Sequence, residues 1–140
     1  MITVDPYLFF AGNCASVISF YEKALGAEVL SLQKFGEGPV EVPAEAKDLV
    51  MHAALRIGGS VIMFSDSMPG QESVAGNNFS LSINCNSTEE QDQYYKALAE
   101  GGQELMPLEE TFWGARFGML VDQFGISWMF SYHGEEPTES

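Results

Sequence analysis

Hydrophobic positions change their spacing in the same order twice along this chain. In the first half, a β-branched and aromatic run at 3–10 precedes apolar residues at helical spacing between Asn13, a candidate N-cap, and Gly26, a candidate stop. Three strand-like runs come next, at 27–35, 49–57 and 60–66. A period near 3.6 is typical of a helix, and a period of 2 is typical of a strand. This half therefore predicts the order strand, helix, strand, strand, strand.

The second half predicts the same order. A strand-like run at 79–85 precedes Ser87 and Glu90, whose spacing is that of a capping box. The helix that they begin is expected to end at Gly101 and Gly102. Three further strands are expected at 103–106, 115–122 and 126–132.

Short matching segments support a duplication. Lys-Ala-Leu occurs at 23–25 and again at 96–98, and Gly59 and Gly125 each stand four residues before a methionine. Internal similarity of this kind is the signature of a repeated unit. We expect an α+β fold in which two tandem βαβββ modules form a curved, partly open β-sheet barrel with helices outside. The two modules are expected at about 3–66 and 78–132.

Segments rich in glycine, proline and charge separate the expected elements. The run 36–48 is predicted to be a mobile loop, 67–77 a linker between the halves, and Gly58-Gly59 a tight hairpin turn. Residues 1–135 are then expected to form a single domain. Residues 136–140 are polar and acidic, so a flexible tail is expected there.

The composition narrows the classes of partner. With 46% hydrophobic and 19% charged residues, the 140-residue chain is expected to fold around a core. Its 20 acidic and 6 basic residues give a net charge of −14, which disfavours binding to nucleic acid or to anionic membranes. The chain has two cysteines, which is too few for a disulfide framework. Residues 1–30 lack a basic start followed by an apolar core, and the sequence has no long apolar run. We therefore expect a cytoplasmic protein that does not enter a membrane.

Three segments resemble a known family as a set. They are YLFFAGNCASVISFYEKALGAEVL at 7–30, MHAALRIGGSVIMFSDSMP at 51–69 and ETFWGARFGMLVDQFGISWMF at 110–130. Together with the order of elements, they resemble the vicinal oxygen chelate superfamily of glyoxalases, dioxygenases and bleomycin-resistance proteins. The resemblance is greatest to its PhnB-like subfamily, also labelled as similar to 3-demethylubiquinone 3-methyltransferase. We expect no methyltransferase activity, because the chain has no G-x-G-x-x-G turn.

The resemblance implies four positions for a divalent metal ion, two from each half. It places Pro6 or Tyr7 at the first position, Met63 at the second, Asn78 at the third and Met129 at the fourth. Thioethers are soft and uncharged, whereas Mg²⁺, Mn²⁺ and Zn²⁺ prefer carboxylate or imidazole donors. We therefore expect that the metal site has been lost and that no cofactor is bound, with a divalent metal ion as the alternative.

Arg116 and Trp113 are candidate ligand-binding residues. Arg116 lies among aromatic residues and glycines in a chain with few cations, and its guanidinium suits a carboxylate or phosphate. The alternative is a structural ion pair with Glu109, Glu110 or Asp122. Trp113 is expected to line a pocket ahead of Trp128, which the alternation of the strand places under the helix; most aromatic residues are expected to be core.

His52, Phe9, Met63, Met129 and Asn78 complete the expected ligand-binding set. His52 alternates with apolar residues on its strand, so it faces either the expected cleft or water, and it can act as acid, base or ligand.

Glu110 is a second candidate for a catalytic base. Asp66 and Asp122 are expected to bond turn backbone, and Cys14 and Cys85 to be small buried hydrophobes.

Three functional classes remain open on these grounds. The favoured one is a homodimeric PhnB-like protein that binds a small organic molecule, which can be anionic, in the cleft between its repeats and without a metal. The alternative is a metal-dependent lyase, isomerase or dioxygenase with an unexpected ligand set such as His52 and Asp66. The acidic surface gives weaker support to a third class, an interaction subunit.

Overall fold

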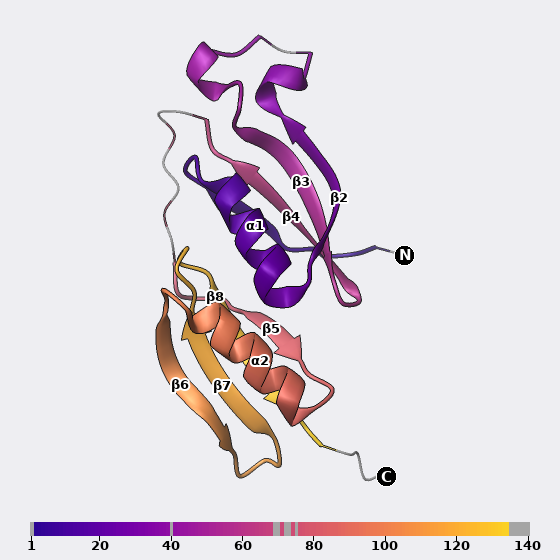
Figure 1. Ribbon diagram of the computed structural model, residues 1–140, viewed down its shortest axis with the longest axis vertical. Helices are drawn as coiled ribbons and strands as arrows, with labels where there is room; N and C mark the ends of the chain where they lie inside the picture. The colour runs from indigo at the N-terminus through magenta and orange to yellow at the C-terminus, as the bar shows by residue number, and fades with distance from the viewer. Residues whose placement is uncertain (1, 40, 69–70, 72–73, 75, 135–140) are drawn as a thin grey trace. The chain divides into compact units, whose positions relative to one another are not determined.

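A computed structural model describes residues 2–39, 41–68, 71, 74 and 76–134 of the chain (Figure 1). The chain divides into two compact units, Met1–Val74 and Ala75–Ser140. The expected tail at 136–140 lies outside the described residues, as does part of the expected linker. That the two units form one domain stays a prediction.

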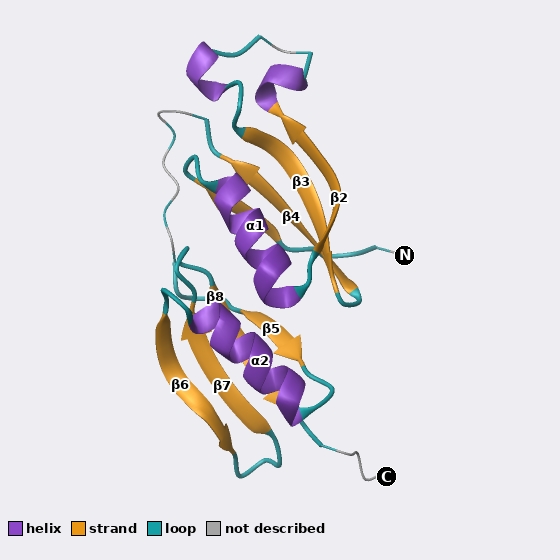
Figure 2. Cartoon of the chain, in the orientation of Figure 1, coloured by secondary structure: helices purple, strands orange, loops and turns teal. Residues whose placement is uncertain are grey.

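The first unit is a four-stranded sheet with one α-helix. Its elements are β1 (Tyr7–Phe10), α1 (Cys14–Leu25), β2 (Glu28–Lys34), two short 3-10 turns (Phe35–Glu37 and Ala44–Ala46), β3 (Val50–Ile57) and β4 (Ser60–Asp66). The strands lie in the order β1-β4-β3-β2, with β1 parallel to β4 and the other pairs antiparallel. Figure 2 shows α1 lying along one face of this sheet.

The second unit repeats this topology. Its elements are β5 (Leu81–Asn84), α2 (Thr88–Ala99), β6 (Gln103–Glu110), β7 (Arg116–Val121) and β8 (Ser127–Tyr132). The strands lie in the order β5-β8-β7-β6, again with one parallel pair, β5 and β8. The predicted α+β fold of two tandem βαβββ modules is confirmed.

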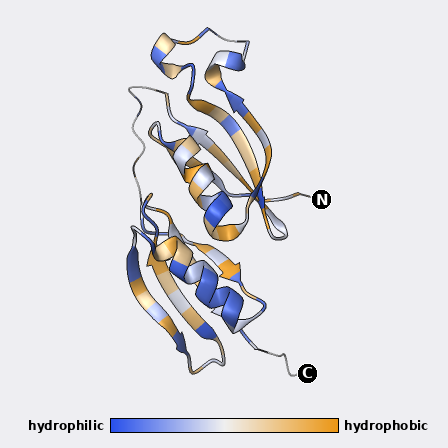
Figure 3. Ribbon diagram, in the orientation of Figure 1, coloured by the Kyte–Doolittle hydropathy of each residue, from blue (hydrophilic) through white to orange (hydrophobic). Residues whose placement is uncertain are grey.

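Each unit has its own core between helix and sheet. In the first unit, Tyr21 of α1 and Phe64 of β4 are fully buried, with ring centroids 5.9 Å apart. In the second unit, Tyr95 of α2 meets Phe130 of β8 edge-on at 5.2 Å. Figure 3 shows a mixture of hydrophobic and hydrophilic colouring on the strands and hydrophilic colouring on the first turns of α2. The helix thus covers the face of the sheet that carries Phe64 in the first unit and Phe130 in the second.

Gly118 allows the helix of the second unit to approach β7 closely. A Cβ atom at this position would lie 2.8 Å from Leu108 Cδ2 and 3.1 Å from Tyr95 Cε2. Real Cβ contacts are longer than this, so a larger residue would force the neighbouring atoms of α2 and β6 away from β7.

Some elements differ from the expectation in their boundaries or content. β6 extends four residues beyond the predicted 106 and passes through Pro107, which lies within a shift of register on an edge strand where proline is tolerated. β1 begins only at Tyr7, after Pro6. The predicted loop at 36–48 contains the two 3-10 turns; its mobility stays a prediction.

The start of α1 is held by a carboxylate from far along the chain. Asp66, at the end of β4, is 3% exposed. Its Oδ1 accepts hydrogen bonds from the backbone N–H groups of Gly12 and Cys14, at 3.0 and 2.9 Å, and its Oδ2 accepts from Val50 N–H at 2.9 Å. Asn13 occupies the N-cap position, but within the described residues its side chain makes no capping hydrogen bond. The prediction that Asn13 stands at the N-cap is confirmed, and the acceptor that serves the first turn is Asp66.

The start of α2 is held locally, as predicted. Ser87 Oγ accepts a hydrogen bond from Glu90 N–H at 3.1 Å. The Glu90 carboxylate accepts from Asn86 N–H at 2.8 Å, one residue before the N-cap. Both bonds join residues within four positions of one another, so the sequence alone revealed this cap.

Among the described residues, no helix combines the length and apolar character needed to cross a membrane.

Candidate functional site

Each sheet has one face covered by its helix, and we call the opposite face its open face. Side chains alternate between the two faces along a strand. Because Phe64 and Phe130 lie on the covered faces, their neighbours Met63 and Met129 lie on the open faces. The two methionines that the sequence paired across the repeat thus occupy matching places in the two units.

The open face of the first unit gathers three of the predicted site residues around Tyr7. Met63 on β4 stands between Tyr7 on β1 and Ala54 on β3 in the ladder. Tyr7 Oη and His52 Nδ1 are 3.0 Å apart and share a hydrogen bond. The Tyr7 and Phe9 rings stack at 4.8 Å, and 57% of the Phe9 side chain is exposed.

Gln33 belongs to the same open face and was missed by the sequence analysis. It is the register partner of His52 on the edge strand β2. No motif marks an isolated glutamine, and only the pairing of β2 with β3 places it beside the imidazole.

The open face of the second unit carries a row of methionines. Met106, Met119 and Met129 are successive register partners across β6, β7 and β8, and Ser82 on β5 continues the row. The sequence analysis identified only Met129 from this row. Directly opposed residues on neighbouring strands have Cβ atoms about 5 Å apart, so the row forms a continuous thioether surface.

Trp113 extends this second surface from the loop before β7. Its ring meets Phe117 edge-on at 5.8 Å, and Phe117 lies on the same face as Met119, two residues further along β7. Trp128 is instead buried, and its Nε1 donates a hydrogen bond to Asp122 Oδ2 at 2.9 Å. The expected burial of Trp128 is confirmed, and the placement of Trp113 in a pocket stays a prediction.

Asn78 does not occupy the position that the sequence analysis gave it. The register partner of Met129 on β5 is Ser82, just as Tyr7 is the register partner of Met63 on β1. Asn78 precedes β5 and is exposed. Strand register, which the sequence leaves open, decides which residue of β5 stands beside Met129.

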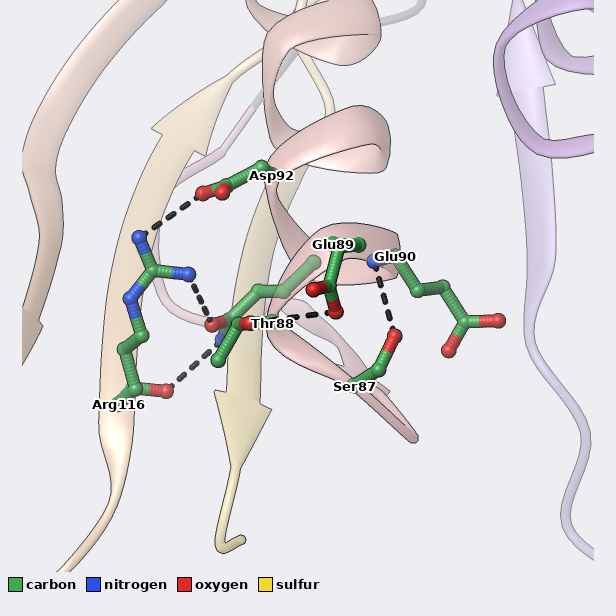
Figure 4. Close-up of polar contacts among 7 residues, drawn as sticks. Ser87, Thr88, Glu89, Glu90, Asp92 and Arg116 are labelled. Atoms are coloured by element: carbon green, nitrogen blue, oxygen red, sulfur yellow. Dashed lines mark hydrogen bonds and ion pairs between the residues drawn. The ribbon is translucent and has the colours of Figure 1, made fainter.

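Arg116 faces the helix and not the open face. Its Nη2 pairs with Asp92 Oδ1 at 2.9 Å, and its Nη1 donates to Gln91 Oε1 at 3.1 Å (Figure 4). Gln91 Nε2 in turn donates to the carbonyl oxygen of Arg116 at 2.8 Å. Arg116 and Met119 are an odd number of residues apart on β7, so Arg116 does not share the open face with the methionine row, and its role in ligand binding stays a prediction. The alternative was an ion pair with Glu109, Glu110 or Asp122, and the observed partner is Asp92.

Glu110 ends β6 opposite Arg116 in the ladder, and its side chain is exposed. It therefore belongs to the side of the sheet that carries Arg116, away from Phe117 and Met119. Its role as a catalytic base stays a prediction.

Asp122 bonds the backbone of its own turn, as expected, whereas Asp66 bonds backbone groups that are remote in sequence and not its own turn. Asp122 is 3% exposed, and its Oδ1 accepts from the backbone N–H groups of Phe124 and Ile126, at 2.8 and 3.1 Å. Asp66 is committed to three backbone donors on the covered side of its sheet, whereas His52 lies on the open side. These two residues lie on opposite faces of the sheet, so they do not form the metal-binding set that was given as an example for the alternative function.

The side chains that pair at Met63 and Met129 in the two ladders do not suit a hard divalent ion. They are a phenol and a thioether in the first unit, Tyr7 and Met63, and a hydroxyl and a thioether in the second, Ser82 and Met129. Within the described residues, no three or more His, Cys, Asp or Glu side chains are grouped so that they could hold a metal ion. Neutral donors of this kind do not replace the carboxylates and imidazoles that such ions prefer.

The two thiols are buried and unreactive in character. Burial, reinforced by the charge of Asp66, raises the pKa of Cys14 from 9.0 to about 12. Burial, with the charge of Glu90, raises the pKa of Cys85 from 9.0 to about 11. Both groups are protonated near neutral pH, so neither is a nucleophile there.

Two surface hollows lie away from the open faces. One, of about 630 Å³, is lined by residues of α2 and β6, including Tyr95, Lys96 and Glu104. The other, of about 360 Å³, lies at the 3-10 turns beside Lys47. Neither is lined by a residue that the sequence analysis predicted for the site.

Comparison with known proteins places this fold in a family. Residues 3–130 match the model of the Glyoxalase/Bleomycin resistance protein/Dioxygenase superfamily. Protein YjdN of Escherichia coli (strain K12) is 38% identical over 147 aligned residues, which cover 97% of this chain and 99% of YjdN.

Two solved structures are similar over most of the chain. Protein PA1353 from Pseudomonas aeruginosa is 40% identical with a TM-score of 0.84, covering 94% of this chain and 98% of PA1353. The PhnB protein from Bacillus cereus is 28% identical with a TM-score of 0.78, covering 94% of this chain and 99% of that protein. The chain therefore belongs to the glyoxalase/bleomycin resistance protein/dioxygenase superfamily.

Proposed function

We propose that this chain is a PhnB-like binding protein that holds a small organic molecule against the open faces of its sheets, without a divalent metal ion. The observation that carries the proposal is the pairing of Tyr7 with Met63 and of Ser82 with Met129 in the two ladders. These side chains offer polarisable apolar surface with a few hydroxyl groups. Such surfaces suit organic ligands, which sites usually bind through apolar contacts and a few polar groups.

The position of the ligand in a cleft between the repeats stays a prediction, as do homodimerisation, a cytoplasmic location and the absence of nucleic-acid or membrane partners. The expectation that the protein is not a methyltransferase also stays a prediction. Light scattering coupled to gel filtration measures the oligomeric state directly.

The proposal is tested by binding with and without metal. Naphthalenemethanol, a neutral fluorescent aromatic alcohol, serves as the probe for protein that has been treated with EDTA and dialysed. We expect it to bind with an affinity that does not change when Mn²⁺ or Zn²⁺ is added. Met63→Ala and Met129→Ala should each weaken binding by about 1–2 kcal/mol, because each removes apolar contact area.

Met68→Ala is the matched control, since Met68 follows β4 and stands outside the ladders. It should leave the affinity unchanged. Loss of probe binding on chelation, restored by one equivalent of metal per chain, would instead support the metal-dependent lyase, isomerase or dioxygenase. Failure of the probe to bind under either condition would overturn the proposal as well.

A further inference from the structure

We propose that the methionine row of the second unit is a binding site for a soft monovalent metal ion, Cu(I). The row consists of Met106 on β6, Met119 on β7 and Met129 on β8. Its ligands are thioether sulfurs, and all of them belong to one sheet of one unit. The inference goes beyond the proposed binding of an organic molecule and does not depend on it.

Strand pairing places the three side chains next to one another. Met106 is the register partner of Met119 in the antiparallel pair β6 and β7, and Met119 is the register partner of Met129 in the antiparallel pair β7 and β8. Directly opposed residues of antiparallel strands lie on the same face, with Cβ atoms about 5 Å apart. Met119 therefore has a methionine on each side and stands at the centre of the site.

The side chains are long enough to meet at one ion. The Cβ atoms of Met106 and Met129 are two strand spacings apart, which is about 10 Å. A metal ion above Met119 is thus about 5 Å from each outer strand. A methionine sulfur stands two bonds beyond Cβ on a flexible side chain, and a metal–sulfur bond adds about 2.3 Å. Each outer side chain covers the distance when it turns toward Met119.

The three thioethers are not needed to fill the core between α2 and the sheet. Leu120 and Phe130, the strand neighbours of Met119 and Met129, are fully buried and fill that core. Met106 is 42% exposed, and the other two methionines are half-buried. In the part of the chain that the structure describes, no methionine is fully buried. The row therefore keeps access to an ion in solution.

The donor set selects the class of metal ion. Thioethers are soft donors that favour Cu(I), whereas Mg²⁺, Ca²⁺ and Mn²⁺ favour the oxygens of carboxylates, carbonyls and water. The residue that continues the row on β5 is Ser82, a neutral hydroxyl. The row thus offers sulfur without carboxylate or imidazole, which suits a soft ion of low charge.

The charges around the row favour a cation. Thioethers are neutral, so an ion that they bind keeps its positive charge. Glu109 is exposed, and it is the register partner of Phe117, which lies on the same face two residues from Met119. Its carboxylate partly offsets the charge of the ion, and the net charge of −14 acts in the same direction. Arg116 alternates to the other face, where it pairs with Asp92 at 2.9 Å.

Silver(I) is the probe that tests the site. It has the charge and the softness of Cu(I), and air does not oxidise it. Silver nitrate is titrated into the full chain in a buffer without chloride, and isothermal titration calorimetry measures the affinity and the stoichiometry. We expect the wild-type protein to bind one silver ion per chain.

Leucine substitutions remove a sulfur and nearly keep the volume of the side chain, so the fold should tolerate them. Met119→Leu should weaken silver binding about 100-fold, because Met119 belongs to both methionine pairs. Met106→Leu and Met129→Leu should each weaken it about tenfold, because each removes one outer ligand.

Met51→Leu is the matched control. Met51 lies on β3 of the first unit, within a shift of register, and its thioether stands beside Gly38. The same substitution at this position should leave silver binding unchanged. A loss in Met51→Leu equal to that in Met119→Leu would overturn the proposal.

The thiols supply the competing explanation, because silver also binds sulfur in cysteine. Cys14 and Cys85 are both buried. Silver held by either thiol would remain bound in Met119→Leu, so full retention of binding in that variant would overturn the proposal. The absence of silver binding in the wild-type protein would overturn it as well.

Naphthalenemethanol separates this inference from the proposed function. Met119→Leu keeps the apolar surface of the row, so the alcohol should still bind this variant while silver binding is weakened. Failure of the alcohol to bind the wild-type protein, with silver binding intact, would overturn the proposed function and leave this inference standing. Far-UV circular dichroism verifies that each variant is folded.

Discussion

The two helices begin in different ways, although they hold equivalent places in units of the same topology. α2 receives its cap from Ser87, three residues from the N–H group that it accepts. α1 receives its cap from Asp66, which reaches the N–H groups of Gly12 and Cys14 from the end of β4. The same structural need is thus met by neighbours in sequence in one unit and by a distant, buried carboxylate in the other.

This difference predicts unequal costs when the two caps are removed. Asp66→Ala leaves three backbone N–H groups without their acceptor, and each buried unsatisfied group costs about 1–3 kcal/mol. We expect the free energy of unfolding to fall by about 3–6 kcal/mol in urea denaturation followed by circular dichroism. Asp48→Ala, at an exposed position, is the control and should be near neutral. A loss as small as that of the control would show that Asp66 is not needed to hold α1.

The buried thiol of Cys14, whose backbone N–H donates to Asp66, predicts that the first unit loses stability at alkaline pH. The pKa of Cys14 is raised in the folded state, chiefly by burial, so folding favours the protonated thiol. The full stability is present below the unfolded pKa of 9.0 and is lost as the pH rises toward about 12. Between about pH 8.5 and pH 10.5, this linkage removes about 2 kcal/mol.

Cys14→Ala removes the titrating group and should flatten that loss. The comparison is between slopes of unfolding free energy against pH, because the substitution also leaves a small cavity that shifts all values together. Equal slopes in the two proteins would contradict the link between Cys14 and alkaline stability.

The smallest effect concerns the two N-cap positions themselves. Ser87→Ala should cost about 1 kcal/mol, the usual value for a lost N-cap side chain. Asn13→Ala should cost much less, because Asp66 already serves the start of α1. Thermal unfolding of the two variants measures both costs, and an equal loss would mean that Asn13 caps α1 in solution.

The sequence predicted those features that depend on residues close together along the chain. The order of elements, the Ser87 cap and the paired places of Met63 and Met129 all follow from local periodicity and spacing. The contacts of Arg116 were not predicted, because Asp92 lies a helix and a strand away and no local pattern links them. The hydrogen bond between Tyr7 and His52 was also not predicted, nor was the row from Met106 to Met129. Both depend on strand register, which the periodicity of the sequence does not determine.

The distant origin of the α1 cap also sets an order of assembly for the first unit. Helix formation needs a costly first turn, and contacts between remote residues form only after the intervening loop has closed. As the chain leaves the ribosome, α1 must wait for β4 before its first N–H groups are satisfied, whereas α2 carries its own nucleation signal at its start.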